Sequence, residues 1–172
     1  YPHASPAVQE RRRALRSLTN QLTLGYLIMR KTIYETNYDR LMKLSIIAKD
    51  GSMLMQQSKS RTAGFMDLVL ERIEHMDGVS GNPGIAFSLA HYFLQNGDLC
   101  KDPEMVIIVY PVSKMVEALT FEQSLPPIYQ EVFPEPSKFY PHLRKELNGF
   151  LRLWLNNLID QGHGKHWALD DI

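Results

Sequence analysis

The chain has 172 residues, 44% of them hydrophobic, and its 19 lysine and arginine residues balance its 19 aspartate and glutamate residues. This length predicts one domain that buries a core of its own, and the apolar fraction argues against a disordered chain. The neutral charge argues against a general nucleic-acid coat but leaves room for a local basic patch.

Cysteine content and hydropathy indicate the compartment. Cys100 is the single cysteine, which excludes an internal disulfide and a zinc site built from cysteines. No apolar run approaches the ~20 residues that cross a bilayer, and no apolar signal core follows a basic region at the N-terminus. We therefore expect a cytoplasmic protein without membrane contact.

Residues 5–47 have helical periodicity. A first helix is predicted from Pro6 towards Gln21, and a second helical pattern runs from Thr23 to Ile47. Gly25 either separates the two helices or weakens one long helix. The first helix carries an apolar stripe of Leu15, Leu18 and Leu22. A second stripe, interpreted as half-buried core in preference to a binding surface, consists of Leu27, Tyr34, Tyr38, Leu41 and Ser45.

The start of the first helix is strongly basic, because it carries Arg11, Arg12, Arg13 and Arg16. One interpretation is a phosphate-binding arm, and the other is a solvated helix start. No aromatic residue is interleaved among the arginines, which favours the solvated helix. Nucleic-acid binding through these residues is therefore expected to be weak and salt-sensitive.

Alternating or continuous apolar patterns predict six strands between residues 52 and 133. They are Ser52–Lys59, Phe65–His75, Ile85–Phe93, Met105–Tyr110, Lys114–Glu122 and Ile128–Phe133. Turn residues separate them at 77–84, at Asn96-Gly97 and at Asp102-Pro103. The connection after Tyr110 is short, so the strand that follows is expected to pair antiparallel with the one before it.

The last predicted element is an amphipathic helix, Pro141–Ile159, with Gly162 at its C-cap. Eight apolar side chains share one side of it: Leu143, Leu147, Phe150, Leu151, Trp154, Leu155, Leu158 and Ile159. The tail, residues 163–172, carries His163 and His166 and is predicted to be mobile. The predicted fold is α+β in a single domain, 1–172: N-terminal helices, an antiparallel sheet of about five or six strands, and this long helix packed on one face.

Most of the chemically capable side chains cluster in Phe87–Pro111. His91, Asp98, Asp102 and Glu104 are the candidate catalytic or metal-binding group, because carboxylates with an imidazole can hold a divalent cation or activate water. The alternative is structural: Asp98 and Asp102 occupy turn positions, and His91 lies on an apolar strand face. We favour the structural interpretation, and no phosphate-binding loop, zinc-protease or serine-hydrolase motif occurs elsewhere in the chain.

Three motifs in this stretch resemble an uncharacterised bacterial family carried on plasmids and integrating conjugative elements: His91-Tyr92, Gln95–Asp98 and Asp102–Met105. A second similarity is to the YqiB-like family of small proteobacterial proteins of unknown function. It involves Asn37–Leu41, Val109-Tyr110, Met115–Ala118, Glu146–Leu151, Trp154-Leu155 and Gly162-His163. Neither family has an established activity, so the resemblance implies a shared fold.

These observations favour a non-catalytic accessory or protein-binding protein of a bacterial mobile element, acting on an unidentified protein partner or through self-association. We expect no cofactor. Two alternatives remain open: a metal-assisted hydrolase or nuclease centred on His91 and the Asp98–Glu104 turn, and nucleic-acid binding through Arg11–Arg16.

Overall fold

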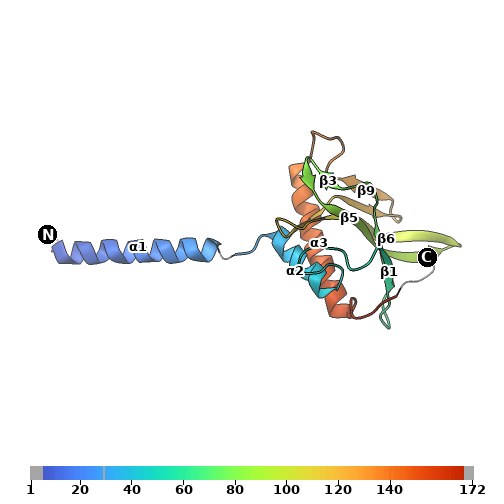
Figure 1. Cartoon of the computed structure of the whole chain (residues 1–172), viewed down its shortest axis with the longest axis horizontal. Helices are drawn as coiled ribbons and strands as arrows, with labels where there is room; N and C mark the ends of the chain where they lie inside the picture. Colours follow the sequence, from blue (N-terminus) through green and yellow to red (C-terminus); the bar gives the residue numbers. More distant parts are fainter. Residues whose placement is uncertain (1–5, 29, 169–172) are drawn as a thin grey trace. The chain divides into compact units, whose positions relative to one another are not determined.

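The computed structural model describes residues 6–28 and 30–168, and the chain divides into two compact units, Tyr1–Thr32 and Ile33–Ile172. The first unit contains α1 (Pro6–Ile28), and the second contains two helices and the sheet (Figure 1). The expectation of a single domain stays a prediction. Residues 9–21 of α1 are all exposed.

The two N-terminal helices are confirmed, but their bounds differ from the prediction. α1 continues through Gly25 to Ile28, so this glycine weakens the helix without ending it. α2 spans Ile33–Lys43, and Ser45 has a φ of 54°, which ends the helix before Ile47. Tyr38 and Leu41 are buried as expected, whereas Ser45 lies beyond the helix. The side chains of Leu22 and Leu27 lie outside the described residues.

The second unit is built on an eight-stranded antiparallel sheet, which confirms the α+β fold. Its order is β10-β1-β2-β5-β6-β8-β9, and β7 also pairs with β6. The strands are β1 (Gln57–Ser60), β2 (Leu68–Arg72), β5 (Ile85–Gln95), β6 (Asp98–Tyr110), β7 (Met115–Ala118), β8 (Thr120–Gln123), β9 (Ile128–Glu131) and β10 (Trp167–Ala168). A separate two-stranded hairpin, β3 (Gly78–Val79) and β4 (Asn82–Pro83), lies in the predicted loop.

Two features account for eight strands where six were predicted. The segment Lys114–Glu122 is interrupted at Leu119, so β7 pairs with the end of β6 and β8 pairs with its middle. The second feature is the strand β10, which lies in the predicted tail, residues 163–172. The antiparallel pairing predicted after Tyr110 is confirmed, because Val109 lies opposite Val116.

The turn predicted at Asn96-Gly97 is confirmed, because both residues have positive φ and join β5 to β6. The prediction of a second turn at Asp102-Pro103 is wrong, because both residues lie inside β6. A cis peptide bond joins them. Proline removes a ladder donor and is tolerated in strands at irregular positions. Here the register shifts between Ala90 and Tyr92, so the two residues Asp102 and Pro103 lie opposite the single residue His91 and form a bulge in β6.

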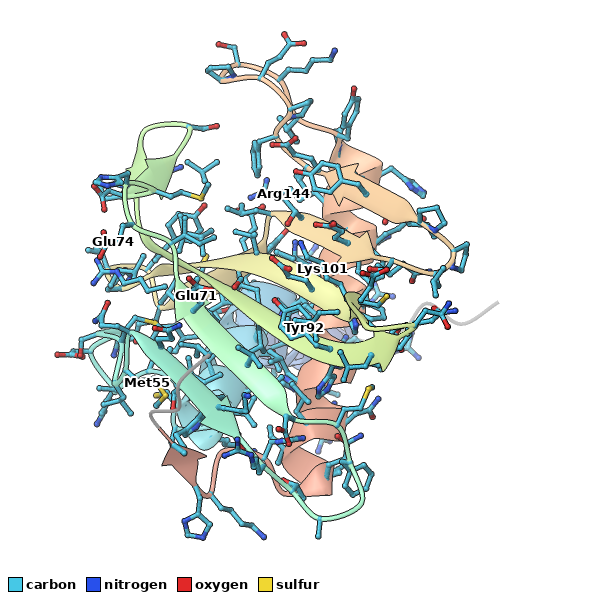
Figure 2. All side chains as sticks on the ribbon, turned by 90° about the vertical axis from the view of Figure 1, so that its right-hand side faces the viewer. Met55, Glu71, Glu74, Tyr92, Lys101 and Arg144 are labelled. Carbon is cyan, nitrogen blue, oxygen red and sulfur yellow. The ribbon has the colours of Figure 1, made fainter. Side chains whose placement is uncertain are left out.

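The long C-terminal helix, α3 (Pro141–Gln161), is confirmed and ends at Gly162, which has a φ of 92°. Of its eight predicted apolar side chains, Leu147, Leu151, Trp154, Leu155 and Leu158 are buried, and Phe150 is exposed. Together with α2, it packs on one face of the sheet to form the core. Figure 2 looks onto the sheet with these helices behind it.

A buried asparagine ties α3 to the sheet. Asn148 is fully buried; its Oδ1 accepts a hydrogen bond from the Ala118 N–H at 3.0 Å, and its Nδ2 donates to the Arg144 carbonyl at 2.8 Å. The Nδ2 of Asn37 in α2 approaches the Asn148 carbonyl at 3.5 Å. Because buried polar groups are costly without partners, these contacts favour one docking position for the helices.

The segment after α3 is ordered to residue 168, so the prediction of a mobile tail is wrong for this part. β10 pairs with β1, and Trp167 Nε1 donates to the Leu44 carbonyl at 2.8 Å. Gly164 has a φ of 86°, and a Cβ there would lie 2.6 Å from the Leu44 Cα, so only glycine fits this approach. The predicted tail residues 169–172 lie outside the described residues.

This ordered segment places His163 beside His91, with ring centroids 5.8 Å apart. His91 is 5% exposed, its Nδ1 lies 2.9 Å from the Asp67 carbonyl, and its ring meets the Trp154 ring edge-on. His163 is 3% exposed, and its Nδ1 lies 3.2 Å from Ser60 Oγ. The interpretation of His91 as a core histidine is thus confirmed, and its neighbour is a second one.

We predict that Leu155→Ala lowers the free energy of unfolding by about 2–5 kcal/mol, because it opens a cavity under α3. Leu155 is fully buried, whereas Leu153 on the same helix is 57% exposed. Leu153→Ala is the matched control and should cost less than about 1 kcal/mol. Urea denaturation measures both changes, and equal losses would show that α3 does not pack on the sheet as described.

We predict that stability falls as the pH drops below about 6.5, the ordinary histidine pKa. Burial lowers the pKa of both His91 and His163, and the neighbouring His91 lowers that of His163 further. The unfolded chain therefore binds protons that the folded chain does not, until the pH reaches the lowered folded pKa values. The loss is at most ~1.4 kcal/mol per pH unit for each histidine.

Urea denaturation between pH 8 and pH 5 tests this dependence. His163→Gln should make the decline shallower, whereas the control His166→Gln should leave it unchanged, because the His166 side chain is exposed. An unchanged slope in a variant lacking both His91 and His163 would contradict the prediction.

Candidate functional site

A groove of about 800 Å³ lies over β6, β8 and β9. Its floor is formed by strand residues, and its walls are the β3–β4 hairpin and the loop after β9. The lining residues are Met76, Gly78, Val79, Ser80, Gly81, Glu104, Val106, Leu119, Thr120, Glu122, Tyr129, Glu131, Phe133, Pro134, Glu135 and Pro136. We call this feature the acidic groove, because four glutamates line it and no lysine, arginine or histidine does.

Side-chain alternation along β6 places the groove on the face of the sheet opposite α2 and α3. Met105 and Ile107 are fully buried in the core beneath these helices, whereas Glu104 and Val106 line the groove. Val106 is only half-buried, and its N–H bonds Thr120 Oγ1 at 3.2 Å. Val106, Leu119 and Phe133 give the groove an apolar surface between its carboxylates.

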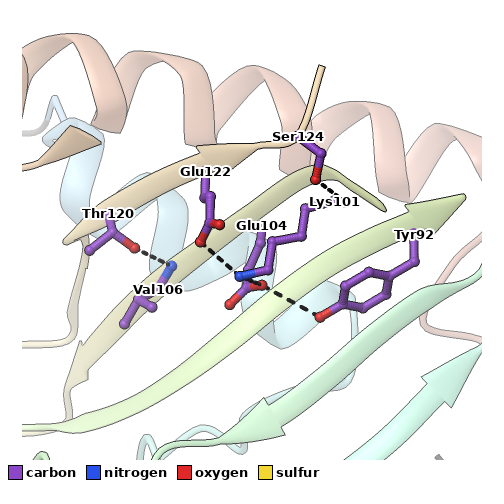
Figure 3. A network of polar contacts seen from close by, with 7 residues as sticks. All are labelled: Tyr92, Lys101, Glu104, Val106, Thr120, Glu122 and Ser124. Carbon is purple, nitrogen blue, oxygen red and sulfur yellow. Dashed lines mark hydrogen bonds and ion pairs between the residues drawn. The ribbon is translucent and has the colours of Figure 1, made fainter. Parts of the chain in front are cut away.

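Two of these carboxylates, Glu104 and Glu122, lie directly opposite each other on β6 and β8. Like charges in such a pair destabilise a sheet, but the Lys101 Nζ lies 2.7 Å from an oxygen of each (Figure 3). The Tyr92 hydroxyl lies 3.5 Å from the same Glu104 oxygen, and the Lys101 N–H donates to Ser124 Oγ at 2.9 Å. One lysine thus holds two carboxylates at the edge of the groove.

The electrostatics of this cluster keep Lys101 charged. Burial disfavours the ammonium, but the hydrogen bonds and charges of Glu104 and Glu122 outweigh it and raise the pKa of Lys101. The pKa of Tyr92 is raised by burial and then by Glu104. The cluster keeps one net negative charge, to which Glu131 in the groove lining adds, whereas Glu135 is paired with Lys138 at 3.6 Å.

The structure does not bring the four predicted site residues together. His91 faces the core beside Trp154, whereas Glu104 lies on the opposite face of the sheet in the acidic groove. Asp98 is exposed next to the hairpin turn, opposite Gln95, and Asp102 is exposed within β6. Among the described residues, no three histidine, cysteine, aspartate or glutamate side chains are grouped so that they could hold a metal ion.

The four arginines predicted as a nucleic-acid arm lie on α1, and all four are exposed. Glu10 is the sole acidic residue in the sequence of this helix, so its four arginines leave a net charge of +3. Within the described ranges, no helix has the length and hydropathy that a membrane span requires.

Sequence reasoning missed most of the acidic groove. It singled out Glu104 but not Glu122, Tyr129, Glu131 or Phe133. The one available signal was the polar residues on the open side of β8, where Thr120 and Glu122 alternate with Phe121. That signal does not reveal which strand lies opposite, so the pairing of Glu122 with Glu104 emerges only from the fold.

Comparison with known proteins identifies a family but no activity. No curated protein and no solved structure matches the chain significantly. One family model, described as a domain of unknown function (DUF6908), matches residues 36–164, which include α2, α3, the acidic groove and the two buried histidines. Because this match covers well over half of the chain, the protein belongs to the DUF6908 family.

Proposed function

We propose that the protein is a non-catalytic binding protein whose acidic groove receives a segment of a partner protein. The observation that carries this proposal is the combination of an apolar floor with four glutamates in a groove of about 800 Å³. The complementary segment carries lysine or arginine side chains next to apolar ones. Such charge complementarity gives an interface its specificity and speeds association.

The state of Lys101, whose amine lies beside the groove, supports binding over catalysis. A lysine acting as a base or nucleophile needs a free lone pair, and therefore a lowered pKa. Lys101 has a raised pKa and is fixed by two carboxylates at 2.7 Å each. Its role is to hold Glu104 and Glu122 in place. These carboxylates in turn present their remaining charge to a lysine or arginine side chain of the bound segment.

The position of β9 supports an extended partner segment. β9 is the last strand in the sheet order, and it lines the groove with Tyr129 and Glu131. An edge strand offers backbone N–H and C=O groups to an added strand, while neighbouring pockets select its side chains. Tyr129 is 61% exposed and supplies an aromatic surface beside this edge.

The sequence resemblance adds a biological setting to the proposal. An accessory protein of a bacterial mobile element acts through protein contacts, and a groove that selects a short basic segment is suited to that role. The partner is therefore sought among protein segments with basic and apolar side chains.

We predict that peptides selected from a random display library on the full chain are rich in lysine or arginine beside apolar residues. Glu131→Lys should weaken their binding by at least tenfold through charge reversal, and Val106→Trp should weaken it by filling the floor of the groove. Fluorescence anisotropy with labelled peptides measures each Kd. Binding should also weaken with added salt, because the charges are partly exposed.

The matched control is Glu146→Lys, the same charge reversal on α3, where the glutamate side chain is 58% exposed and does not line the groove. It should leave the Kd within about twofold. Selected peptides that bind Glu131→Lys and Val106→Trp as tightly as the unchanged chain would overturn the proposal.

The exposed arginines of α1 support nucleic-acid binding as a second candidate function. If Arg11, Arg12, Arg13 and Arg16 each contact a phosphate, the affinity for duplex DNA should fall with salt at a log–log slope of roughly −3 to −4. Changing all four to alanine should remove both the affinity and the slope. DNA affinity that survives this change would contradict a role for α1.

A further inference from the structure

Arg144 on α3 is held by a buried carboxylate. Its Nε donates to Oε1 of Glu117, whose side chain is 3% exposed, and the Tyr110 hydroxyl donates to Oε2 at 3.2 Å. Both oxygens of Glu117 therefore have partners. The Arg144 side chain is 36% exposed, so the guanidinium is anchored at one edge and open to solvent at another.

Aromatic rings surround the same guanidinium. Its central carbon lies 5.5 Å from the ring centroid of Tyr34, 5.7 Å from that of Phe139 and 5.9 Å from that of Phe133. A guanidinium has five N–H donors, of which Nε carries one. Arg144 donates only that one to the described residues. The four N–H groups of Nη1 and Nη2 are thus left for a ligand, in a position that the rings and Glu117 fix.

Two smaller hollows are lined by this arginine, and one of them shares lining residues with the acidic groove. One of about 160 Å³ is lined by Val79, Ser80 and Phe133, which also line the groove, and by Arg144. The next, of about 410 Å³, is lined by Arg144 and Asn82 and continues to Ser113. Arg144 and Lys101 are separated along the molecule (Figure 2). A bound segment that extended from the groove into the nearer hollow would meet the groove's carboxylates and the guanidinium in turn.

We propose that Arg144 is a carboxylate-binding subsite, which takes an aspartate or glutamate side chain of the segment bound in the acidic groove. This inference rests on the proposed function. It adds a basic site beside the acidic groove. The free edge of a fixed guanidinium matches the two oxygens of a carboxylate, and a lysine ammonium cannot reproduce this geometry. Asn82, in both smaller hollows, is a further donor beside the arginine.

The experiment uses labelled peptides from the selection on the full chain, all with amidated C-termini so that only side chains supply carboxylates. Each acidic residue is changed to its amide, and Kd is measured on the unchanged chain and on Arg144→Lys. One Glu→Gln or Asp→Asn change should weaken binding to the unchanged chain at least tenfold. On Arg144→Lys the acidic and amide peptides should bind within about twofold of each other.

Removing Arg144 alone leaves Glu117 buried without its partner, so a second variant guards against misfolding. Glu117→Gln combined with Arg144→Met replaces both charges with neutral groups, and it should also abolish the difference between the acidic and amide peptides. Thermal melting of each variant confirms folding. In both variants the tenfold loss caused by Glu131→Lys should persist.

Four outcomes would overturn the inference as stated. Peptides whose binding depends on Glu131 but is unaffected by every amide change overturn the carboxylate subsite and leave the groove proposal standing. A difference between acidic and amide peptides that persists in both Arg144 variants places the carboxylate elsewhere. Selected peptides whose Kd is unchanged by Glu131→Lys and by Val106→Trp overturn the groove proposal itself. A peptide with a free C-terminus that binds more tightly only when Arg144 is present would show that the subsite takes a chain terminus instead.

Discussion

The register of β6 is the constraint on which the second unit depends. This strand pairs with β5 on one side and with β7 and β8 on the other, so its side-chain alternation sets both faces of the sheet. Met105, Ile107 and Val109 face the core beneath the helices, and Glu104 and Val106 face the acidic groove. A slip of one residue would exchange these two sets and bury Glu104. The Asn96-Gly97 turn fixes the register at one end of the strand.

Buried polar contacts then determine how α3 lies on this sheet. Apolar packing alone is non-directional, whereas the buried Asn148 needs the Ala118 N–H and the buried Glu117 needs Arg144. Each is costly to bury without its partner, so a shifted helix would leave them unsatisfied. Asn37, Glu117 and Asn148 are all buried at the contacts between α2, α3 and β7. These three polar side chains therefore fix how the elements pack on one another.

Structural features that depend on neighbouring residues in the sequence could be predicted, whereas features that depend on distant residues could not. The alternation of β5, the positive-φ pair Asn96-Gly97 and the apolar stripe of α3 are local patterns, and all three were predicted correctly. Asp102-Pro103 was misread because it forms a bulge within β6, and this bulge is defined by the pairing with His91 on the neighbouring strand. His163 was assigned to a mobile tail because its partners, Ser60 and His91, are distant in the sequence. The acidic groove draws on four separate segments, so its shape has no local signature.

The neutral charge of the chain conceals a separation of charges along it. The 23 residues of α1 carry four arginines and one glutamate, whereas the acidic groove is lined by four glutamates and no basic side chain. At physiological salt, exposed charges act over only ~8–10 Å, so a partner responds to the local set and not to the sum. A balanced total therefore does not argue against charged partners of either sign. It is the grouping of like charges, at α1 and in the groove, that gives each surface its own preference.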